Sequence, residues 1–150
     1  HLCMEKLDFS NISAENDVIE QIKNFVSAGF ISQEEFEALD ISKFIKFSQS
    51  PLCRRMIENV STLKKEVSFK ILTDIFRLYG INSDDLVVVQ GTIDAYFEDT
   101  DRKLVLVDYK TDKVTGGTAE PIASRYRIQL ETYASALEKI LGKKVKEKHI

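Results

Sequence analysis

Residues 90–111 read QGTIDAYFEDTDRKLVLVDYKT, two apolar runs joined by a short polar segment. With their flanks the runs cover residues 86–97 and 103–110, and both are rich in Val, Leu, Ile and aromatic residues, which favour strands. The polar residues 98–102 between them are typical of a turn. The stretch therefore predicts an antiparallel β-hairpin at the centre of the fold.

The apolar residues of the hairpin suggest how its two strands pair. If Ala95 faces Val107, the two strands share one continuous apolar face by the two-residue period of a strand. Asp94 then lies opposite Asp108 on the other face. Directly opposed β-carbons are roughly 4.5–5.5 Å apart, a distance at which two like charges destabilise a sheet. The pairing therefore requires a group that neutralises the two carboxylates.

A divalent cation is the simplest neutralising group, because hard ions such as Mg²⁺ bind carboxylate oxygens and keep water molecules for chemistry. Lys110 points to the same face as Asp108, about 6.6 Å farther along the strand at about 3.3 Å per residue. At that distance its ammonium can reach a substrate phosphate or an attacking water. The alternative is an ordinary solvated hairpin end with acidic and basic tips, and the residues alone leave both interpretations open.

The composition indicates one domain with a substantial core, since the chain has 150 residues of which 43% are hydrophobic. A net charge of -3 argues against broad coating of nucleic acid, although a nuclease with carboxylate metal ligands can be acidic overall. Cys3 and Cys53 are too few for a zinc ribbon or a four-cysteine cluster, and we expect reduced thiols and a cytoplasmic location. No apolar stretch approaches the roughly 18 residues of a membrane span, so we expect no membrane partner.

Helical periodicity dominates residues 1–63. Residues 1–9 are expected to be the end of a helix that begins upstream, which suggests a piece of a longer polypeptide. Ser32 and Glu35 form a capping-box pattern, and Ser50 followed by Pro51 is a typical helix start. Further helices are therefore predicted over residues 13–30, 32–39 and 41–48 and from residue 51 onward.

Residues 64–150 are expected to form an α/β core. Residues 65–72 alternate apolar and polar side chains and predict a half-buried strand with Glu66 near its start, although residues 71–79 are also compatible with a helix. The glycine-containing residues 111–121 predict a surface loop beside the acidic pair. Residues 122–141 predict a long helix ended by Gly142, and a last strand is expected after it.

Three motifs occur in the order found in a known nuclease family. They are G-x-I-D at residues 91–94, D-Y-K-T at residues 108–111 and Q-L-x-x-Y at residues 129–133, with His1 in an upstream helix. The series resembles the RecB-type nucleases of the PD-(D/E)xK superfamily. Within that group the chain is most similar to the C-terminal nuclease domain of the larger, AddA component of bacterial AddAB helicase–nucleases, which also carries an H-x-x-x-x-x-L-D-F helix and an E-x-x-F strand. The absence of four clustered cysteines favours AddA over its cluster-bearing partner AddB and over Cas4-like proteins.

The resemblance implies a restriction-endonuclease-like α/β fold, with a small mixed β-sheet flanked by helices after a helical N-terminal segment. Residues 1–150 would form a single nuclease domain, with a helical segment over residues 1–63 and the catalytic core over residues 64–150. The implied cofactor is Mg²⁺ or Mn²⁺, and its implied ligands are His1, Asp94, Asp108 and the backbone carbonyl of Tyr109.

The resemblance also implies roles for residues around the metal. Lys110 would act on the attacking water or on the phosphate, and Glu66 would lie in or just behind the site. Gln129 and Tyr133 would line the DNA-binding side of the cleft. Tyr126 or Tyr133 is a candidate for stacking a base. Three basic residues flank the predicted cleft and are candidates for phosphate contacts: Lys113, Arg125 and Arg127.

The implied function is a metal-dependent exonuclease or endonuclease of single-stranded DNA within an ATP-dependent helicase–nuclease of double-strand-break repair and recombination. Its partners would be DNA, the helicase domains of the same chain and a second nuclease subunit. One alternative is a non-catalytic nucleic-acid-binding or protein-docking domain that keeps the nuclease fold. Another is a restriction-type endonuclease that cuts double-stranded DNA as a dimer. The presence of Asp94, Asp108 and Lys110 together favours a catalytic domain.

Overall fold

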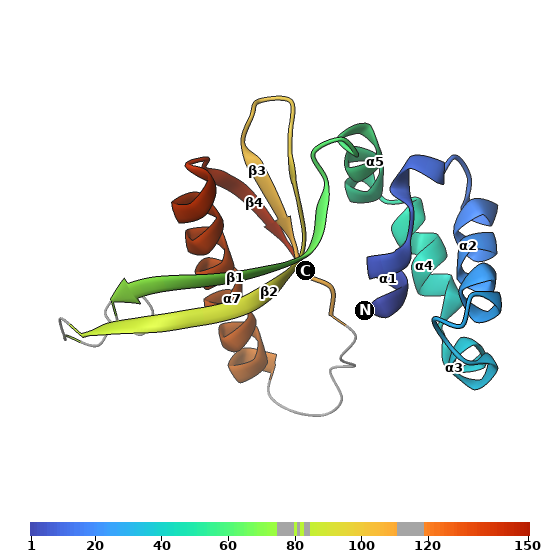
Figure 1. The fold of residues 1–150 in the computed structure, drawn as a ribbon, viewed down its shortest axis with the longest axis horizontal. Coiled ribbons are helices and arrows are strands. Elements are labelled where there is room, and N and C mark those ends of the chain that lie inside the picture. The colour runs from blue at the N-terminus through green and yellow to red at the C-terminus, as the bar shows by residue number, and fades with distance from the viewer. Residues whose placement is uncertain (75–79, 81, 83–84, 111–118) are drawn as a thin grey trace. The chain divides into compact units, whose positions relative to one another are not determined.

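The computed structural model describes residues 1–74, 80, 82, 85–110 and 119–150, and the side chains of all of these except residues 119–125. The chain divides into a helical unit of residues 1–63 and an α/β unit of residues 64–150 (Figure 1). The division falls where the helical pattern of the sequence gives way to strand alternation. That the two units together form a single nuclease domain stays a prediction.

The helical unit contains five α-helices and one short 3₁₀ helix. Their bounds are α1 Leu2–Lys6, η1 Phe9–Asn11, α2 Glu15–Ser27, α3 Gln33–Ala38, α4 Ile41–Ser48 and α5 Pro51–Glu58. The predicted capping box is confirmed, because the Glu35 N–H donates to Ser32 Oγ at 3.1 Å and the Ser32 N–H donates to Glu35 Oε2 at 2.7 Å. Ser50 caps α5 by accepting the Cys53 N–H at 3.1 Å.

The predicted helix over residues 1–9 is too long. It ends at Lys6, and Asp8 starts a separate 3₁₀ turn because its carboxylate accepts the Ser10 N–H at 3.0 Å. α2 is likewise shorter at both ends than the predicted stretch 13–30. The core of the helical unit includes the buried side chains of Leu7, Phe9, Val18, Ile22, Cys53 and Met56.

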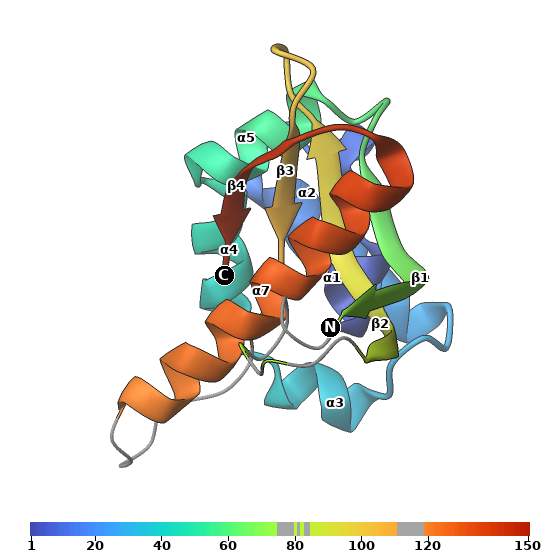
Figure 2. The same cartoon turned by 90° about the vertical axis from the view of Figure 1, so that its left-hand side faces the viewer.

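The α/β unit is built on a four-stranded sheet of order β1-β2-β3-β4. Its elements are β1 Lys64–Asp74, β2 Leu86–Glu98, β3 Leu104–Val107, α7 Ala119–Leu141 and β4 Val145–His149. The first three strands pair antiparallel in sequence order, and β4 pairs parallel to β3. α7 crosses one face of this mixed sheet (Figure 2). Together with the N-terminal helices, this architecture confirms the predicted restriction-endonuclease-like α/β class.

Two predicted segments extend beyond the described residues. β1 keeps the predicted alternation, with Phe69, Ile71 and Thr73 buried, and continues to Asp74, whereas residues 75–79 lie outside the described residues. The predicted loop 111–121 also lies outside them up to residue 118. α7 starts at Ala119, three residues earlier than predicted, and its 23 residues do not make it a membrane helix. Among the described residues, no helix is both long and apolar enough to span a membrane.

The pairing of β2 with β3 confirms the predicted register, since Ala95 pairs with Val107 and Phe97 with Val105. β3 ends at Val107, so Asp108 follows the strand directly rather than lying inside it. All four residues of β3 are buried, whereas the hairpin pattern predicts only one apolar face. The reason is that Leu104–Val107 contains no polar residue that could hydrate a second face.

The ladder between β1 and β2 is irregular at Glu66 and Asp94. Residues on both sides of Glu66 are paired with β2, but Glu66 is absent from the pairing and has φ of +50°. This left-handed conformation is uncommon for any residue other than glycine. Ile93 and Tyr96 both contact the core cluster under α7, although in a regular strand they would point to opposite faces. The face of β2 turned toward α7 therefore changes at Asp94.

A buried apolar cluster joins the sheet to α7. It consists of Phe69, Ile71, Ile93, Leu104, Leu106, Leu130, Ala134, Ala136, Leu137 and Val145. The predicted apolar stripe of α7 is confirmed at Leu130 and Leu137. Its last predicted member is wrong, because Ile140 is 54% exposed.

We expect Leu106→Ala to lower the free energy of unfolding by about 2–5 kcal/mol, because Leu106 is fully buried and its truncation leaves a cavity. The matched control is Leu86→Ala, since Leu86 is 62% exposed and its truncation should change stability by less than about 0.5 kcal/mol. Urea unfolding followed by circular dichroism measures both. Equal losses in the two variants would contradict the position of the core.

Candidate active site

Two buried aspartates come from neighbouring strands. Asp94 lies in β2 and is 8% exposed, and Asp108 follows β3 and is 2% exposed. The Tyr109 N–H donates to Asp94 Oδ2 at 2.6 Å, so the backbone after β3 holds the carboxylate of β2. The Asp108 N–H donates to the carbonyl of His149 at 2.9 Å, at the end of β4. Three strands thus fix the positions of the two carboxylates.

Burial raises the pKa of the Asp94 carboxyl above its ordinary value of 3.8. The hydrogen bond from the Tyr109 N–H lowers that pKa, the negative charge of Asp108 raises it, and the positive charge of Lys110 lowers it again. Asp94 and Asp108 are therefore close enough to disfavour each other's ionised form, as their predicted opposition requires. A cation beside them would favour the ionised form of both.

Lys110 is the positive charge nearest to Asp108 among the ion pairs of the described residues. Its Nζ lies 2.5 Å from Asp108 Oδ2, and its side chain is 19% exposed. The angle between the two groups does not meet that of a hydrogen bond, so the contact is an ion pair by distance. Asp108 Oδ2 is thus a buried oxygen that accepts no regular hydrogen bond and remains suited to a positive ligand.

α7 adds an amide and a phenol to this cluster. Lys110 Nζ donates to Gln129 Oε1 at 3.0 Å, and Gln129 Nε2 donates to Tyr133 Oη at 2.8 Å. The four-residue spacing of Gln129 and Tyr133 places both on one face of the helix. The two residues expected to line the DNA side therefore support the lysine directly or through each other, forming a continuous polar chain from Asp108 to Tyr133.

Phe69 and Gly91 set the position of the Tyr133 ring. The rings of Phe69 and Tyr133 meet edge to face, with centroids 5.4 Å apart and an interplanar angle of 77°. A β-carbon at Gly91 would lie 3.1 Å from the Phe69 ring and 3.3 Å from the Tyr133 ring, closer than ordinary packing. The absence of a side chain at Gly91 therefore leaves space for both rings. Sequence reasoning identified these two residues only as motif letters, and their functional signal is the spacing to Glu66 and Asp94.

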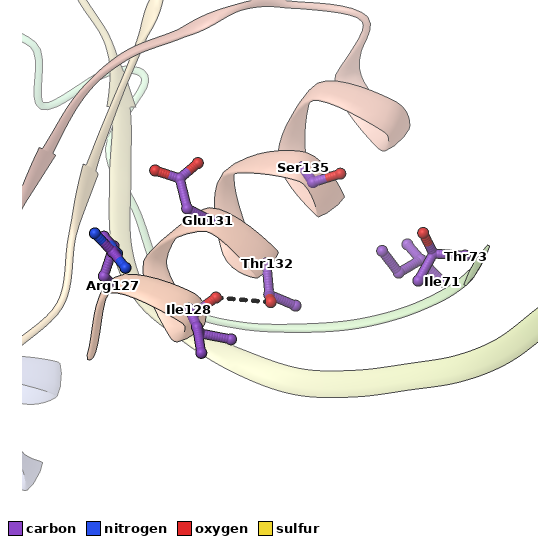
Figure 3. A pocket seen from close by; sticks show the side chains of 7 residues that line it. All are labelled: Ile71, Thr73, Arg127, Ile128, Glu131, Thr132 and Ser135. Atoms are coloured by element: carbon purple, nitrogen blue, oxygen red, sulfur yellow. Dashed lines mark hydrogen bonds between the residues drawn. The ribbon is translucent and has the colours of Figure 1, made fainter. Parts of the chain in front are cut away.

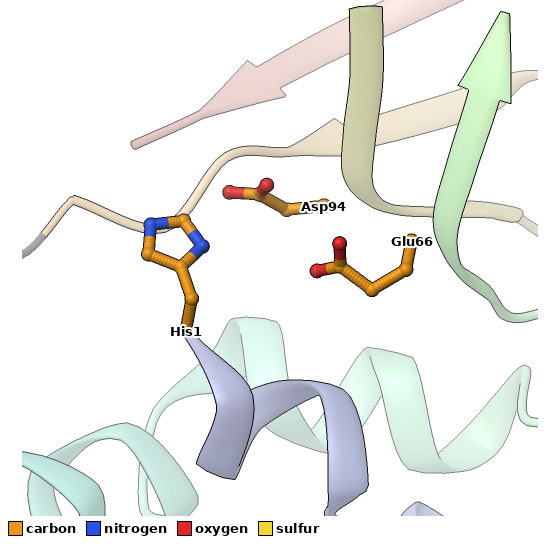
Figure 4. A group of neighbouring side chains, drawn as sticks. All are labelled: His1, Glu66 and Asp94. Carbon is orange, nitrogen blue, oxygen red and sulfur yellow. The ribbon is translucent and has the colours of Figure 1, made fainter.

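Glu66 contributes a carboxylate beside Asp94. Their nearest ligand oxygens are within 4.8 Å of each other, and Figure 4 shows the two side chains next to one another. With Asp108, these residues supply hard oxygen donors, the ligand type preferred by Mg²⁺ and Mn²⁺, so the residues present fit such an ion. His1 belongs to the helical unit, so its part in a metal site stays a prediction, as does that of the Tyr109 carbonyl.

The predicted phosphate contacts are only partly described. Lys113 lies outside the described residues, and Arg125 lies outside the described side chains. Arg127 is exposed and lines a cavity of about 330 Å³ beside α7 (Figure 3). The other residues that line it are Ile71, Thr73, Ile128, Glu131, Thr132 and Ser135. The structure therefore does not group Arg127 with Lys110 and the two aspartates, and its contact with phosphate stays a prediction.

We expect Asp94→Asn to raise the free energy of unfolding at neutral pH when metal is removed by a chelator. The raised pKa of Asp94 means that its ionised form destabilises the folded state, whereas an asparagine oxygen can still accept the Tyr109 N–H. The gain should shrink as the pH falls toward 3.8, where the unfolded-state carboxyl also becomes protonated. Urea unfolding at several pH values measures it, and a gain that grows toward low pH would contradict the assignment.

Comparison with known proteins agrees with this geometry. The model of the PD-(D/E)XK nuclease superfamily matches residues 1–149. The chain is 40% identical over 154 residues to the larger polypeptide, designated A, of the ATP-dependent helicase/nuclease of Thermoanaerobacter sp. (strain X514). It is 38% identical over 161 residues to the protein of the same name from Clostridioides difficile (strain 630). All of the chain is covered in both cases, but it spans only 12% of the length of each relative. The chain belongs to the PD-(D/E)XK nuclease superfamily.

Proposed function

We propose that this chain is a metal-dependent deoxyribonuclease module that hydrolyses phosphodiester bonds of single-stranded DNA, as an exonuclease or an endonuclease. The observation that carries the proposal is the buried cluster in which Asp94, Asp108 and Lys110 lie within direct electrostatic reach of one another. Both relatives are named as components of an ATP-dependent helicase/nuclease, and the chain matches a small part of each. This supports a module of an ATP-dependent helicase–nuclease that acts in double-strand-break repair and recombination.

The proposed cofactor is Mg²⁺ or Mn²⁺, held by Asp94 and Asp108 with Glu66 beside them. His1 and the carbonyl of Tyr109 complete the proposed ligand set. When bound, such an ion supplies a water of lowered pKa and polarises the scissile phosphate. The two aspartates keep the negative charge that attracts the ion, and the Tyr109 N–H keeps Asp94 oriented through its hydrogen bond of 2.6 Å.

Lys110 supplies the positive charge for the phosphate as it becomes more negative in the transition state. Its Nζ is already directed by Asp108 and Gln129, so little reorganisation accompanies the reaction. Tyr133 orients Gln129 through the hydrogen bond of 2.8 Å, and so acts on the lysine at one remove. The proposed partners are single-stranded DNA, helicase domains of the same polypeptide and a second nuclease subunit, with a cytoplasmic location.

We expect Lys110→Ala to lower the cleavage rate of a labelled single-stranded DNA by about 10²- to 10³-fold, the usual loss for a preorganised charge. Asp108→Ala should lose more, because it removes a proposed metal ligand, and a chelator should abolish cleavage by the wild type. Lys103→Ala is the matched control, since Lys103 lies exposed in the turn before β3 and should leave the rate unchanged. Asp108→Ala protein that cuts at the wild-type rate would refute the proposed site.

The substrate can be tested separately from the metal site. We expect faster cleavage of single-stranded DNA than of a blunt duplex of the same sequence, by a protein that sediments as a monomer of this chain. Preferential duplex cleavage by a dimer would favour a restriction-type endonuclease. Calorimetry with Mn²⁺ provides the remaining distinction, because a non-catalytic docking domain should show no binding at a defined stoichiometry, whereas the proposed site should bind and Asp108→Asn should weaken that binding.

A further inference from the structure

Tyr126 forms one wall of the Lys110 environment. Lys110 Nζ lies over the Tyr126 ring, 4.8 Å from its centroid, within the roughly 6 Å at which an ammonium is attracted to an aromatic face. Tyr126 precedes Gln129 by three residues, so α7 presents a ring and an amide to the same ammonium. Both side chains are partly buried, which reduces the screening of the attraction by water.

Three groups surround the Lys110 ammonium. Asp108 Oδ2 is 2.5 Å from Nζ, Gln129 Oε1 is 3.0 Å from it, and the Tyr126 ring covers a third side. A lysine side chain is a flexible four-carbon stem, so its charge is useful for catalysis only where the surroundings confine it. The two polar contacts direct the ammonium, and the ring limits its movement away from them.

The contacts of both tyrosines bear on the expectation that one of them stacks a base. The face of Tyr126 under the ammonium cannot receive a nucleobase unless Lys110 leaves its place. Tyr133 is engaged at its hydroxyl by Gln129 and at its ring by Phe69. Stacking on either ring would therefore disturb the arrangement of the lysine.

We propose that Tyr126 is a positioning residue for Lys110 in phosphodiester hydrolysis, and not a stacking platform for a base. The proposal rests on the proposed nuclease function. Because the attraction arises from the face of the ring, phenylalanine should replace tyrosine at this position, whereas an aliphatic side chain of similar size should not.

The test compares Tyr126→Phe and Tyr126→Leu in the full-length polypeptide. We expect Tyr126→Leu to lower the maximal cleavage rate of single-stranded DNA by about 2- to 30-fold, the range of a cation–π contact converted to rate. Its dissociation constant for the same DNA should stay within about twofold of the wild-type value, and Tyr126→Phe should keep both values. Ile128→Leu is the control for a substitution on the same helix. A loss of DNA affinity that accounts for the whole loss of rate would overturn the proposal in favour of base stacking.

A second measurement is independent of activity. Reductive methylation of lysines with formaldehyde and cyanoborohydride, read by mass spectrometry, reports how freely each amine is accessible. We expect Tyr126→Leu to increase the labelling rate of Lys110, and both Tyr126→Phe and the exposed Lys103 within each protein to remain at their wild-type rates. If the wild type cuts no DNA with Mg²⁺ or Mn²⁺, the proposed function fails, and the labelling still decides the contact. Equal labelling of Lys110 in all variants would show that the ring does not hold it.

Discussion

The α/β unit has to accommodate two carboxylates that repel each other in a place with little water. Asp94 and Asp108 are both buried, and each raises the cost of ionising the other. The surroundings answer this constraint with a backbone N–H directed at Asp94 and an ammonium directed at Asp108. Both groups come from the residues that immediately follow Asp108, so the D-Y-K tripeptide carries the carboxylate together with the partners that stabilise the pair. A bound cation extends the same electrostatic solution.

α7 gives this pair a rigid second wall. Tyr126, Gln129 and Tyr133 occur at three- and four-residue steps and reach the lysine or each other, whereas Leu130 and Leu137 on the adjoining part of the helix enter the core. The same helix thus packs against the sheet and directs the polar groups. Because these groups stand on a helix rather than on a loop, their positions are set by the packing of the whole unit.

Much of this arrangement follows from elementary patterns in the sequence. The period of two in β2 and β3 gave the correct pairing of Ala95 with Val107 and placed Asp94 near Asp108, and cap residues located the starts of α3 and α5. The irregular ladder at Glu66 could not be predicted, because strand periodicity assumes regular backbone and a glutamate gives no signal for positive φ. The contact of Tyr126 with Lys110 was missed because it joins elements distant in sequence, and helix periodicity shows only that a residue faces the core side.

The backbone at Glu66 has a consequence for how this position tolerates change. A left-handed conformation costs a residue with a β-carbon roughly 1–2 kcal/mol, and glycine avoids most of that cost. If position 66 were randomised and the variants sorted for thermal resistance alone, glycine and asparagine should be enriched. Sorting for catalysis should instead retain an acidic side chain, if the proposed role of Glu66 is correct. The same position would then separate the requirements of the scaffold from those of the chemistry, and the glutamate found there marks the second requirement as the stronger one.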